Sequence, residues 1–307
     1  MSRRRKGRPV SGWICLDKPV GITSTKAVSK VRWLFGARRA GHAGTLDPLA
    51  TGVLPIALGE ATKTVPVVQE DGRKFYRFEV RWGIETATDD AEGDVVATAN
   101  ARPDPDAIRA LLPEFTGDIM QTPPAFSAIK VDGERAYDLA RGGEEVVLEP
   151  REVTIESLDL VGAPNADTAV FECACGTGTY VRALARDMGR RLDCRGHVTA
   201  LRRLEVGPFT TDNAITLDQL EAAHEPDDPA SLDGFLKPLG FALSDLPEIP
   251  VNAGDAAKLG RGQSLLLRGR DAPIMAGRAH ATHAGVSVAM GEIEAGTFHP
   301  RRVFLTH

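Results

Sequence analysis

The sequence is poor in features that would place a protein outside the cell or in a membrane. It holds four cysteines in 307 residues, a usage typical of reduced intracellular thiols and not of a disulfide scaffold. Its longest uncharged apolar stretch, residues 49–59, is too short to cross a bilayer. The amino terminus is basic but lacks an apolar core of signal-peptide length. We therefore expect a cytoplasmic protein without membrane contact.

Familiar cofactor and metal motifs are also missing. The sequence contains no Walker A motif and no Gly-x-Gly-x-x-Gly fingerprint. The pairs Cys173/Cys175 and His280/His283 do not complete a four-ligand zinc site by local spacing. Nothing in the pattern pairs a serine with a histidine and an acid for nucleophilic catalysis. The local sequence therefore gives no sign of a metal or nucleotide site.

Acidic residues are absent from one long segment. Residues 18–46 contain no Asp or Glu and six Lys or Arg. Residues 1–46 carry eleven basic side chains against one acid, so the rest of the chain must carry −15 to give the net charge of −5. This asymmetry predicts a face that binds a polyanion on an otherwise acidic protein. Residues 1–9 alone are interpreted as a solvated basic tail.

A single acid, Asp47, stands at the end of this basic segment. Gly44 and Gly52 flank it and Pro48 follows it. A residue before proline is disfavoured in helical conformation, and glycine permits the bends that other residues resist. We expect a tight loop that presents the Asp47 carboxylate. An ordinary turn residue is the alternative, because Asp-Pro commonly begins turns.

Periodicity predicts a mixture of strands and helices. The expected strands cover residues 12–16, 75–82, 153–160, 168–175 and 201–206, and the expected helices cover 24–34, 104–112 and about 180–192. Ser24 and Thr179 are expected to cap the first and last of these helices. Strict alternation in 75–82 predicts a half-buried antiparallel strand with Tyr76 at its start. Residues 89–93 are interpreted as an acidic turn.

Arg182 occupies an unfavourable place in this scheme. It falls in the first turn of the helix after residue 179, where the helix dipole disfavours a cation. Such a position suggests a specific anionic partner, although an ion pair that only stabilises the fold is an alternative. An ionised aspartate beside an arginine suits nucleophilic catalysis. With RNA as the partner, a buried aromatic ring could stack on an extruded base.

The chain is predicted to contain two domains. Residues 10–246 would form the larger one, with a glycine-containing excursion at 131–151 that could be mobile. Residues 212–247 are rich in proline and acid and lead into a connection. Residues 247–307 would form a small β-rich domain with strands at 264–267, 286–294 and 302–305 and a helix capped by Asn252.

Several motifs resemble those of the TruB family of tRNA pseudouridine synthases. They follow the family's order over about residues 10–210, and they include Leu16-Asp-Lys-Pro-Val-Gly21, Arg39-Ala-Gly-His-Ala-Gly-Thr-Leu-Asp47, Gly59-Glu-Ala-Thr-Lys63, Lys74-Phe-Tyr-Arg77, Gln121-Thr-Pro-Pro-Ala-Phe-Ser-Ala-Ile-Lys130, Gly178-Thr-Tyr-Val-Arg182 and His197-Val-Thr-Ala-Leu-Arg-Arg-Leu204. A weaker match, residues 291–304, is similar to the family's small RNA-binding PUA-like domain.

The resemblance implies an α+β fold with a mixed, mainly antiparallel sheet, flanking helices and a C-terminal β-rich PUA-like domain. It also implies that uridine 55 of the tRNA T-loop is isomerised to pseudouridine without a metal or other cofactor. Asp47 would be the nucleophile that releases the base from C1′, Arg182 would pair with Asp47, and Tyr76 would stack on the flipped base. The segment 131–151 would be a flexible thumb that closes over the T-loop.

The remaining implied roles concern substrate binding. His42 would pack into the opened T-loop, Tyr180 and Leu201 would line the pocket, and Lys18 and Pro19 would support its wall. Lys130, at the end of its motif, is assigned to the same group. The expected partner is tRNA alone, bound by a monomer that needs no other protein.

Two other functions stay open from the sequence. One is a non-catalytic RNA-binding or RNA-folding protein that has kept the fold, and assistance to tRNA folding is also compatible with catalysis. The other is a subunit guided by a partner RNA, which the compact length and the lack of long basic extensions disfavour.

Overall fold

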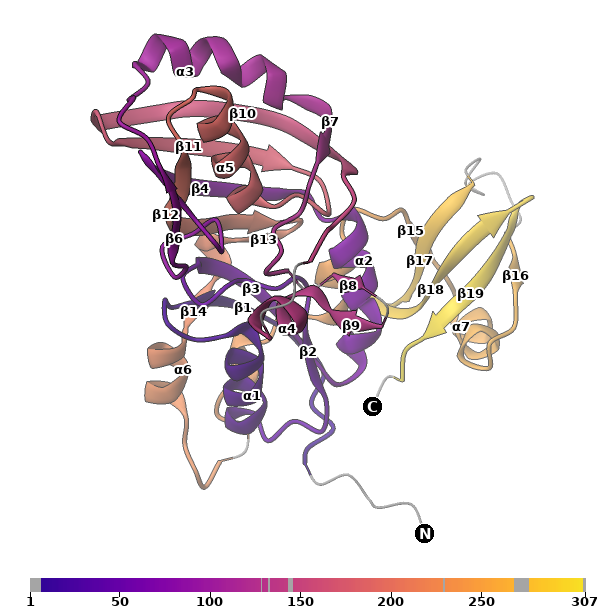
Figure 1. Ribbon diagram of the computed structural model, residues 1–307. Coiled ribbons are helices and arrows are strands. Elements are labelled where there is room, and N and C mark those ends of the chain that lie inside the picture. The colour runs from indigo at the N-terminus through magenta and orange to yellow at the C-terminus, as the bar shows by residue number, and fades with distance from the viewer. Residues whose placement is uncertain are drawn as a thin grey trace.

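The computed structural model describes residues 7–305, apart from 128, 132, 143–145, 229 and 268–275. Figure 1 shows a large sheet with helices packed around it and a smaller sheet beside it. The large sheet has ten strands, and its main path is β14-β1-β3-β12-β4-β11-β10-β7. Among its pairs, only β1 with β14 and β12 with β3 are parallel within the described chain. The predicted α+β fold with a mainly antiparallel sheet is confirmed.

The strands of the large sheet are β1 (Gly12–Lys18), β2 (Ala40–His42), β3 (Thr51–Leu58), β4 (Lys74–Trp82), β7 (Gly117–Gln121), β10 (Arg151–Asn165), β11 (Thr168–Cys175), β12 (Gly196–Val206), β13 (Phe209–Thr210) and β14 (Ile215–Thr216). Two short hairpins join β5 (Ile84–Thr86) to β6 (Val95–Thr98) and β8 (Lys130–Val131) to β9 (Glu134–Arg135). The helices of this part are α1 (Ser24–Leu34), α2 (Val65–Asp71), α3 (Pro105–Leu111), α4 (Ala136–Arg141), α5 (Val181–Arg191) and α6 (Leu217–Ala223).

The core lies where α5 covers the sheet beside β4. Along β4 the buried residues Tyr76, Phe78, Val80 and Trp82 alternate with residues that are exposed or half-buried. The Phe78 ring stacks on Phe171 of β11 at 5.3 Å between centroids. Val181, Leu184 and Met188 of α5 join the same cluster of buried side chains. The alternation expected from the sequence is therefore confirmed.

Two helix caps differ from the prediction. Thr23, and not Ser24, caps α1, since its side chain accepts a hydrogen bond from the backbone N–H of Lys26. The Ser24 hydroxyl is committed instead to the backbone of Leu46. Helix α5 begins after Tyr180, not Thr179, and Tyr180 makes no side-chain capping hydrogen bond.

Two strands are clearly longer than the sequence suggested, since β10 covers 151–165 and not 153–160. β12 begins at Gly196 and not at residue 201. Its register against β4 shifts between Val198 and Ala200 and again between Arg203 and Glu205. Each irregularity breaks the alternation of buried and exposed residues on which strand prediction depends.

The C-terminal part folds into a five-stranded sheet with the order β15-β17-β18-β19-β16. Its elements are β15 (Glu248–Pro250), α7 (Ala253–Gly260), β16 (Leu265–Leu266), β17 (Gly277–His283), β18 (Val286–Glu294) and β19 (Thr297–Val303). Asn252 caps α7 as expected, because its side chain accepts from the Asp255 N–H at 2.9 Å. Strand β17 was not predicted, and the last strand, expected at 302–305, covers 297–303.

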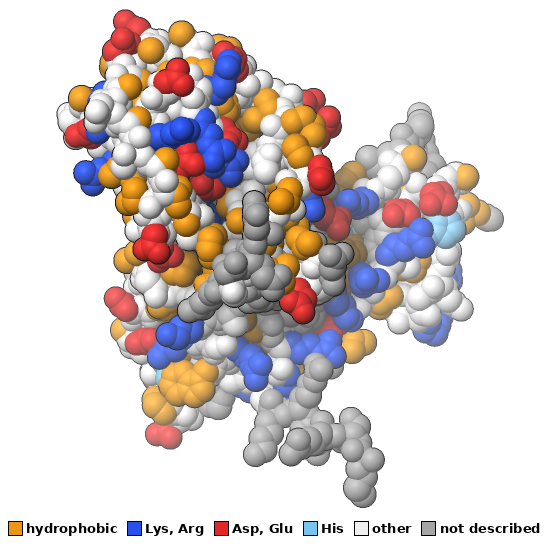
Figure 2. Space-filling model, in the orientation of Figure 1, with side chains coloured by type: hydrophobic (Ala, Val, Ile, Leu, Met, Phe, Trp, Pro, Cys, Tyr) orange, Lys and Arg blue, Asp and Glu red, His pale blue; other side chains and the backbone are white. Residues whose placement is uncertain are grey.

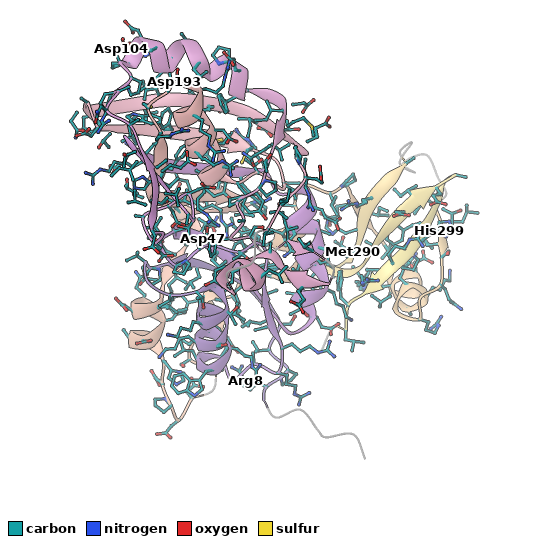
Figure 3. The ribbon with its side chains drawn as sticks, viewed as in Figure 1. Arg8, Asp47, Asp104, Asp193, Met290 and His299 are labelled. Atoms are coloured by element: carbon teal, nitrogen blue, oxygen red, sulfur yellow. The ribbon has the colours of Figure 1, made fainter. Side chains whose placement is uncertain are left out.

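The C-terminal sheet lies against the region of α2 (Figure 1). The Lys63 ammonium donates to the Val303 carbonyl at 2.7 Å, and Glu60 accepts from the Leu305 N–H at 2.9 Å. A cavity of about 190 Å³ opens at this junction, and Met290 lines it. Figure 3 shows Met290 well apart from Asp47, so this cavity is separate from the Asp47 loop. Among the described residues, no helix is both long and apolar enough to span a membrane.

Gly52 is required by the close approach of two strands. Its φ is +99°, and a Cβ there would lie 2.1 Å from the Arg203 carbonyl oxygen. We expect Gly52→Ala to lower the free energy of unfolding by roughly 2–4 kcal/mol, because the backbone of β12 must shift. Urea denaturation measures this loss. Gly41→Ala is the matched control, since a Cβ there meets nothing within 4 Å; equal stability of the two variants would contradict the expectation.

Candidate active site

Asp47 lies on the loop between β2 and β3, near the centre of the larger part of the molecule (Figure 3). Hydrogen bonds from the segment 21–24 hold this loop in place. The Ser24 hydroxyl donates to the Leu46 carbonyl and accepts from the Leu46 N–H, at 2.9 and 2.8 Å. The Gly21 N–H donates to the Pro48 carbonyl at 2.8 Å. The Asp47 side chain keeps 35% of its surface exposed, so the carboxylate is fixed in place and still accessible.

Arg203 also holds the Asp47 loop in place. It is 1% exposed and extends from β12. Its guanidinium donates to the carbonyl oxygens of Gly44, Thr45 and Val53, at 3.1, 3.3 and 2.8 Å. Arg203 belongs to the motif 197–204, but no role for it follows from the sequence. Its contacts join β12 to segments about 150 residues earlier, which local patterns do not reveal.

Arg182 is the cation that meets Asp47. Its Nε lies 3.0 Å from Asp47 Oδ2, and its side chain is only 7% exposed. Arg182 is the second residue of α5, so the unfavourable position at the helix start inferred from the sequence is observed. Asp47 is the anionic partner of Arg182 that this position suggested.

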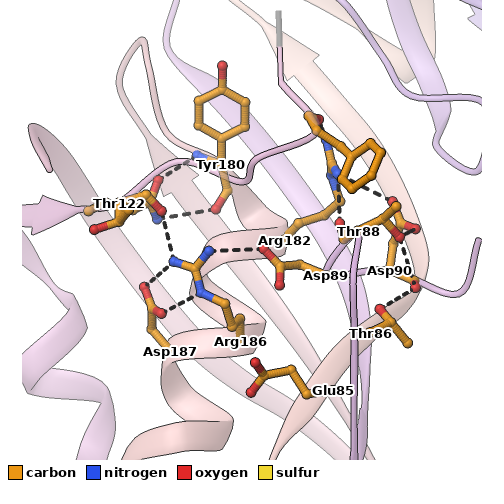
Figure 4. A network of polar contacts seen from close by, with 12 residues as sticks. Glu85, Thr86, Thr88, Asp89, Asp90, Thr122, Tyr180, Arg182, Arg186 and Asp187 are labelled. Carbon is orange, nitrogen blue, oxygen red and sulfur yellow. Dashed lines mark hydrogen bonds and ion pairs between the residues drawn. The ribbon is translucent and has the colours of Figure 1, made fainter. Parts of the chain in front are cut away.

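Arg182 also holds a second carboxylate (Figure 4). Its Nη1 donates to the Thr88 carbonyl at 2.7 Å and lies 3.5 Å from Asp90 Oδ2, while Nη2 donates to the Phe126 carbonyl at 3.0 Å. The Asp90 side chain is 3% exposed and accepts from the Thr88 hydroxyl. One guanidinium therefore joins an accessible aspartate to a buried one, and its remaining donors face carbonyls.

The interpretation of residues 89–93 as a plain acidic turn was therefore incomplete. The turn is present, but Asp89 and Asp90 are both buried and both paired with arginines of α5. A signal existed in the sequence. Arg182, Arg186 and Arg190 recur every fourth residue, so they share one face of the helix and require acidic partners if that face is covered.

Tyr76 lies at the start of β4, as predicted. It stands opposite Cys173 of β11 and Arg203 of β12 in the strand register. The residue is 7% exposed. Burial raises the pKa of the Tyr76 phenol, an effect that Arg203 partly opposes. The phenol therefore stays protonated at neutral pH.

The other residues predicted to bind substrate are distributed around this centre. Tyr180 precedes α5, and its backbone N–H and carbonyl both bond to the Gln121 side chain, at 2.8 and 3.2 Å. Burial raises the pKa of the Tyr180 phenol. Leu201 is a buried residue of β12. His42 is half-buried on β2, and burial, reinforced by Arg203, lowers the pKa of its imidazole.

Lys18 supports the loop from a buried position. It is 0% exposed, and its ammonium donates to the carbonyls of Pro19 and Ile22, both at 2.9 Å, and to the Pro48 carbonyl of the loop at 3.5 Å. Burial lowers the pKa of Lys18 to about 8, although the nearby Asp47 raises it. Pro19 is exposed beside it. Lys130 begins β8, but its side chain lies outside the described residues.

This arrangement suits covalent chemistry at one carboxylate. Asp47 is partly exposed and held in place, a guanidinium fixes its orientation, and buried aromatic side chains come from neighbouring strands. In the described ranges, no group of three or more His, Cys, Asp or Glu side chains is arranged to hold a metal ion.

Comparison with known proteins gives the family. Residues 32–181 match the N-terminal domain of TruB family pseudouridylate synthases, and residues 182–244 match the tRNA pseudouridylate synthase B C-terminal domain. The chain is similar to the tRNA pseudouridine synthase B of Agrobacterium fabrum, with 58% identity over 98% of this chain and 97% of the relative. It is 57% identical to the protein of the same name from Rhizobium meliloti, over 99% and 98% of the two chains.

Solved structures agree with this result. A chain of a Cbf5-Nop10-Gar1 complex superposes with a TM-score of 0.74 at 25% identity, over 96% of this chain and 85% of that one. A chain of the archaeal box H/ACA sRNP Nop10-Cbf5 complex gives 0.72 at 24% identity, over 95% and 84%. The second match supports the fold alone. The resemblance inferred from the motifs is confirmed: the chain belongs to the TruB family of pseudouridylate synthases, and it is an isomerase.

Proposed function

We propose that this protein converts uridine 55 in the T-arm of tRNA to pseudouridine, with Asp47 as the nucleophile and without a cofactor. The observation that carries the proposal is the 3.0 Å contact between Arg182 and an Asp47 carboxylate that keeps 35% of its side chain exposed on a braced loop. The names of the relatives, tRNA pseudouridine synthase B, support tRNA as the substrate.

The chemistry proposed for Asp47 leaves the composition of the uridine unchanged. A carboxylate oxygen of Asp47 attacks C1′ of the ribose, the N1–C1′ bond breaks, and its electron pair leaves with the uracil ring. The ring turns, C5 attacks C1′, and the carboxylate departs. Loss of the C5 proton and protonation of N1 complete the isomerisation. A carboxylate suits both steps, because it is a nucleophile when ionised and a stable leaving group afterwards.

Arg182 and Tyr76 have complementary roles in this proposal. Arg182 orients Asp47 through its Nε while Asp90, Thr88 and Phe126 hold the rest of the guanidinium. Tyr76 stacks on the base after it leaves the T-loop, which offsets part of the cost of unstacking. Its protonated phenol gives it a polar end within the same site.

The remaining residues are proposed to hold the RNA. His42 fills the space that the uridine leaves in the T-loop, Tyr180 and Leu201 line the base pocket, and Lys18 with Pro19 forms its wall. Lys130 would contact the RNA just before the segment 131–151, which we propose closes over the T-loop. Figure 2 shows Lys and Arg side chains gathered below the grey residues and at the junction with the C-terminal sheet, a distribution that suits an extended phosphate backbone.

An isolated T-arm hairpin tests whether this single chain suffices. We expect the purified protein to release tritium from a hairpin labelled at C5 of its uridines, with no second protein and no guide RNA added. A hairpin with cytidine at the position equivalent to 55 is the control and should release none. No release from the uridine hairpin would contradict a stand-alone enzyme and would favour a guided subunit or a binding protein.

A further inference from the structure

The mechanism above uses only the first of three arginines on one face of α5. Arg182, Arg186 and Arg190 lie four residues apart, and each meets an acid of the segment 85–93. The pairs run in opposite directions along the two segments: Arg182 with Asp90, Arg186 with Asp89, and Arg190 with Glu85. We call these three pairs the arginine ladder.

Arg186, the middle rung, repeats the contacts of Arg182 one helical turn later (Figure 4). Arg182 bonds to the Thr88 and Phe126 carbonyls. Arg186 lies 3.0 Å from Asp89 Oδ2 through Nη1 and donates to the Thr122 carbonyl at 2.8 Å through Nη2. Both arginines therefore bridge the same two segments, the turn 86–93 and the stretch 121–127.

The middle rung is buried and strongly held. Arg186 is 7% exposed, and the adjacent Asp187 also accepts from its guanidinium at 2.7 Å. Helix α5 is a rigid element. The contacts of Arg186 with Asp89 and Thr122 therefore fix the distances of the turn 86–93 and of the stretch 121–127 from this helix. Arg182 reaches Asp47 from this same helix, so the spacing set by Arg186 determines what the Arg182 guanidinium can contact.

Asp89 is held in the turn through both its backbone and its side chain. Its φ is +61°, a left-handed conformation that aspartate and asparagine adopt more readily than most other non-glycine residues. On the backbone side, the Asp89 carbonyl accepts from the Val198 N–H at 3.0 Å. On the side-chain side, Arg186 is the ion-pair partner at 3.0 Å. Burial raises the pKa of Asp89 to about 6 although Arg186, Arg182 and Arg190 oppose this effect.

We propose that Arg186 is a positioning residue: by bridging Asp89 and the Thr122 carbonyl, it keeps the turn and the stretch 121–127 where Arg182 can hold Asp90 and orient Asp47 at once. Arg186 touches neither Asp47 nor the reacting atoms. The inference rests on the proposed roles of Asp47 and Arg182, and it adds a residue outside the reacting centre on which the reaction rate depends.

The test compares single-turnover rate constants on tritium-labelled tRNA for variants of the full chain. We expect Arg186→Gln to slow the reaction about 10- to 100-fold, as small displacements of reacting groups do, with tRNA affinity unchanged. Asp89→Asn keeps the shape of the side chain and suits the left-handed backbone, so we expect a smaller loss of about 3- to 30-fold. Arg191→Gln is the control. Arg191 lies on the same helix, and its loss removes only an exposed ion pair with Glu114, so this variant should react like the wild type.

A second comparison separates positioning from general destabilisation. We expect the double variant Arg186→Gln/Asp90→Asn to lose less than the product of the two single losses, because part of the effect of Arg186 runs through the placement of that carboxylate. Wild-type rates for Arg186→Gln, or independent losses that multiply in the double variant, would overturn the proposal. If Arg186→Gln does not fold, Asp89→Asn decides the matter: a slowed reaction supports the proposal and a wild-type rate overturns it.

Asp47→Asn in the same assay distinguishes an error in the nucleophile from an error in the role of Arg186. Turnover by Asp47→Asn would mean that the proposed nucleophile is wrong. An inactive Asp47→Asn together with a fully active Arg186→Gln would remove only the positioning role.

Discussion

Replacing Asp47 with asparagine is expected to abolish isomerisation while tRNA binding stays at the wild-type level. The amide has the shape of the carboxylate and its oxygen can still accept from Arg182, so the loop should keep its structure. The neutral amide oxygen is a much poorer nucleophile than the carboxylate. Loss of a nucleophile reduces turnover by at least about 10⁴-fold in well-studied enzymes. Single-turnover tritium release measures the rate, and filter binding measures affinity.

Asp106→Asn is the matched control for this substitution. Asp106 is also an aspartate that pairs with an arginine, but its side chain is 96% exposed on α3. The control should react at the wild-type rate. If Asp47→Asn reacts like Asp106→Asn, another group forms the bond to the ribose.

Arg182→Met is expected to damage both activity and stability. Removal of the group that orients Asp47 should slow the reaction about 10²- to 10³-fold, the range seen when one preorganised donor is lost. The buried Asp90 would lose its guanidinium, and an unpaired buried charge costs roughly 3–5 kcal/mol. The hydrogen bond from the Thr88 hydroxyl remains and offsets part of that cost. Single-turnover kinetics and urea denaturation measure the two effects.

The two effects of Arg182→Met should separate in a double variant. Adding Asp90→Asn removes the unpaired charge, so we expect stability to recover in part while the reaction stays slow. Arg109→Met, on the exposed pair with Asp106, should change neither quantity appreciably. Wild-type stability of Arg182→Met would show that Asp90 does not depend on this guanidinium.

Much of the fold and of the site follows from local sequence patterns. The alternation from Tyr76 to Trp82 predicts β4, because one face of the strand is covered and the other is not. Gly44 and Pro48 predict that Asp47 lies on a loop, since neither favours a helix at this point. The unfavourable position of Arg182 at a helix start predicts an anionic partner, and the structure places Asp47 there.

Other parts of the site depend on contacts that no local pattern records. Ser24 is an acceptable capping residue, yet Thr23 caps the helix and Ser24 braces Leu46, 22 residues later. Arg203 meets the Asp47 loop only because β12 pairs with β3 and β4. Asp90 resembled a turn residue because its partner, Arg182, lies about 90 residues further on. Non-local pairing of this kind is set by the order of the strands in the sheet.

The most direct measurement uses full-length tRNA that carries tritium only at C5 of uridine 55. We predict that the wild-type protein alone releases this tritium and that the digested product contains pseudouridine at position 55, whereas Asp47→Asn binds the same tRNA and releases none. Release of the label by Asp47→Asn, or modification of other uridines while residue 55 stays unchanged, would contradict the proposed reaction.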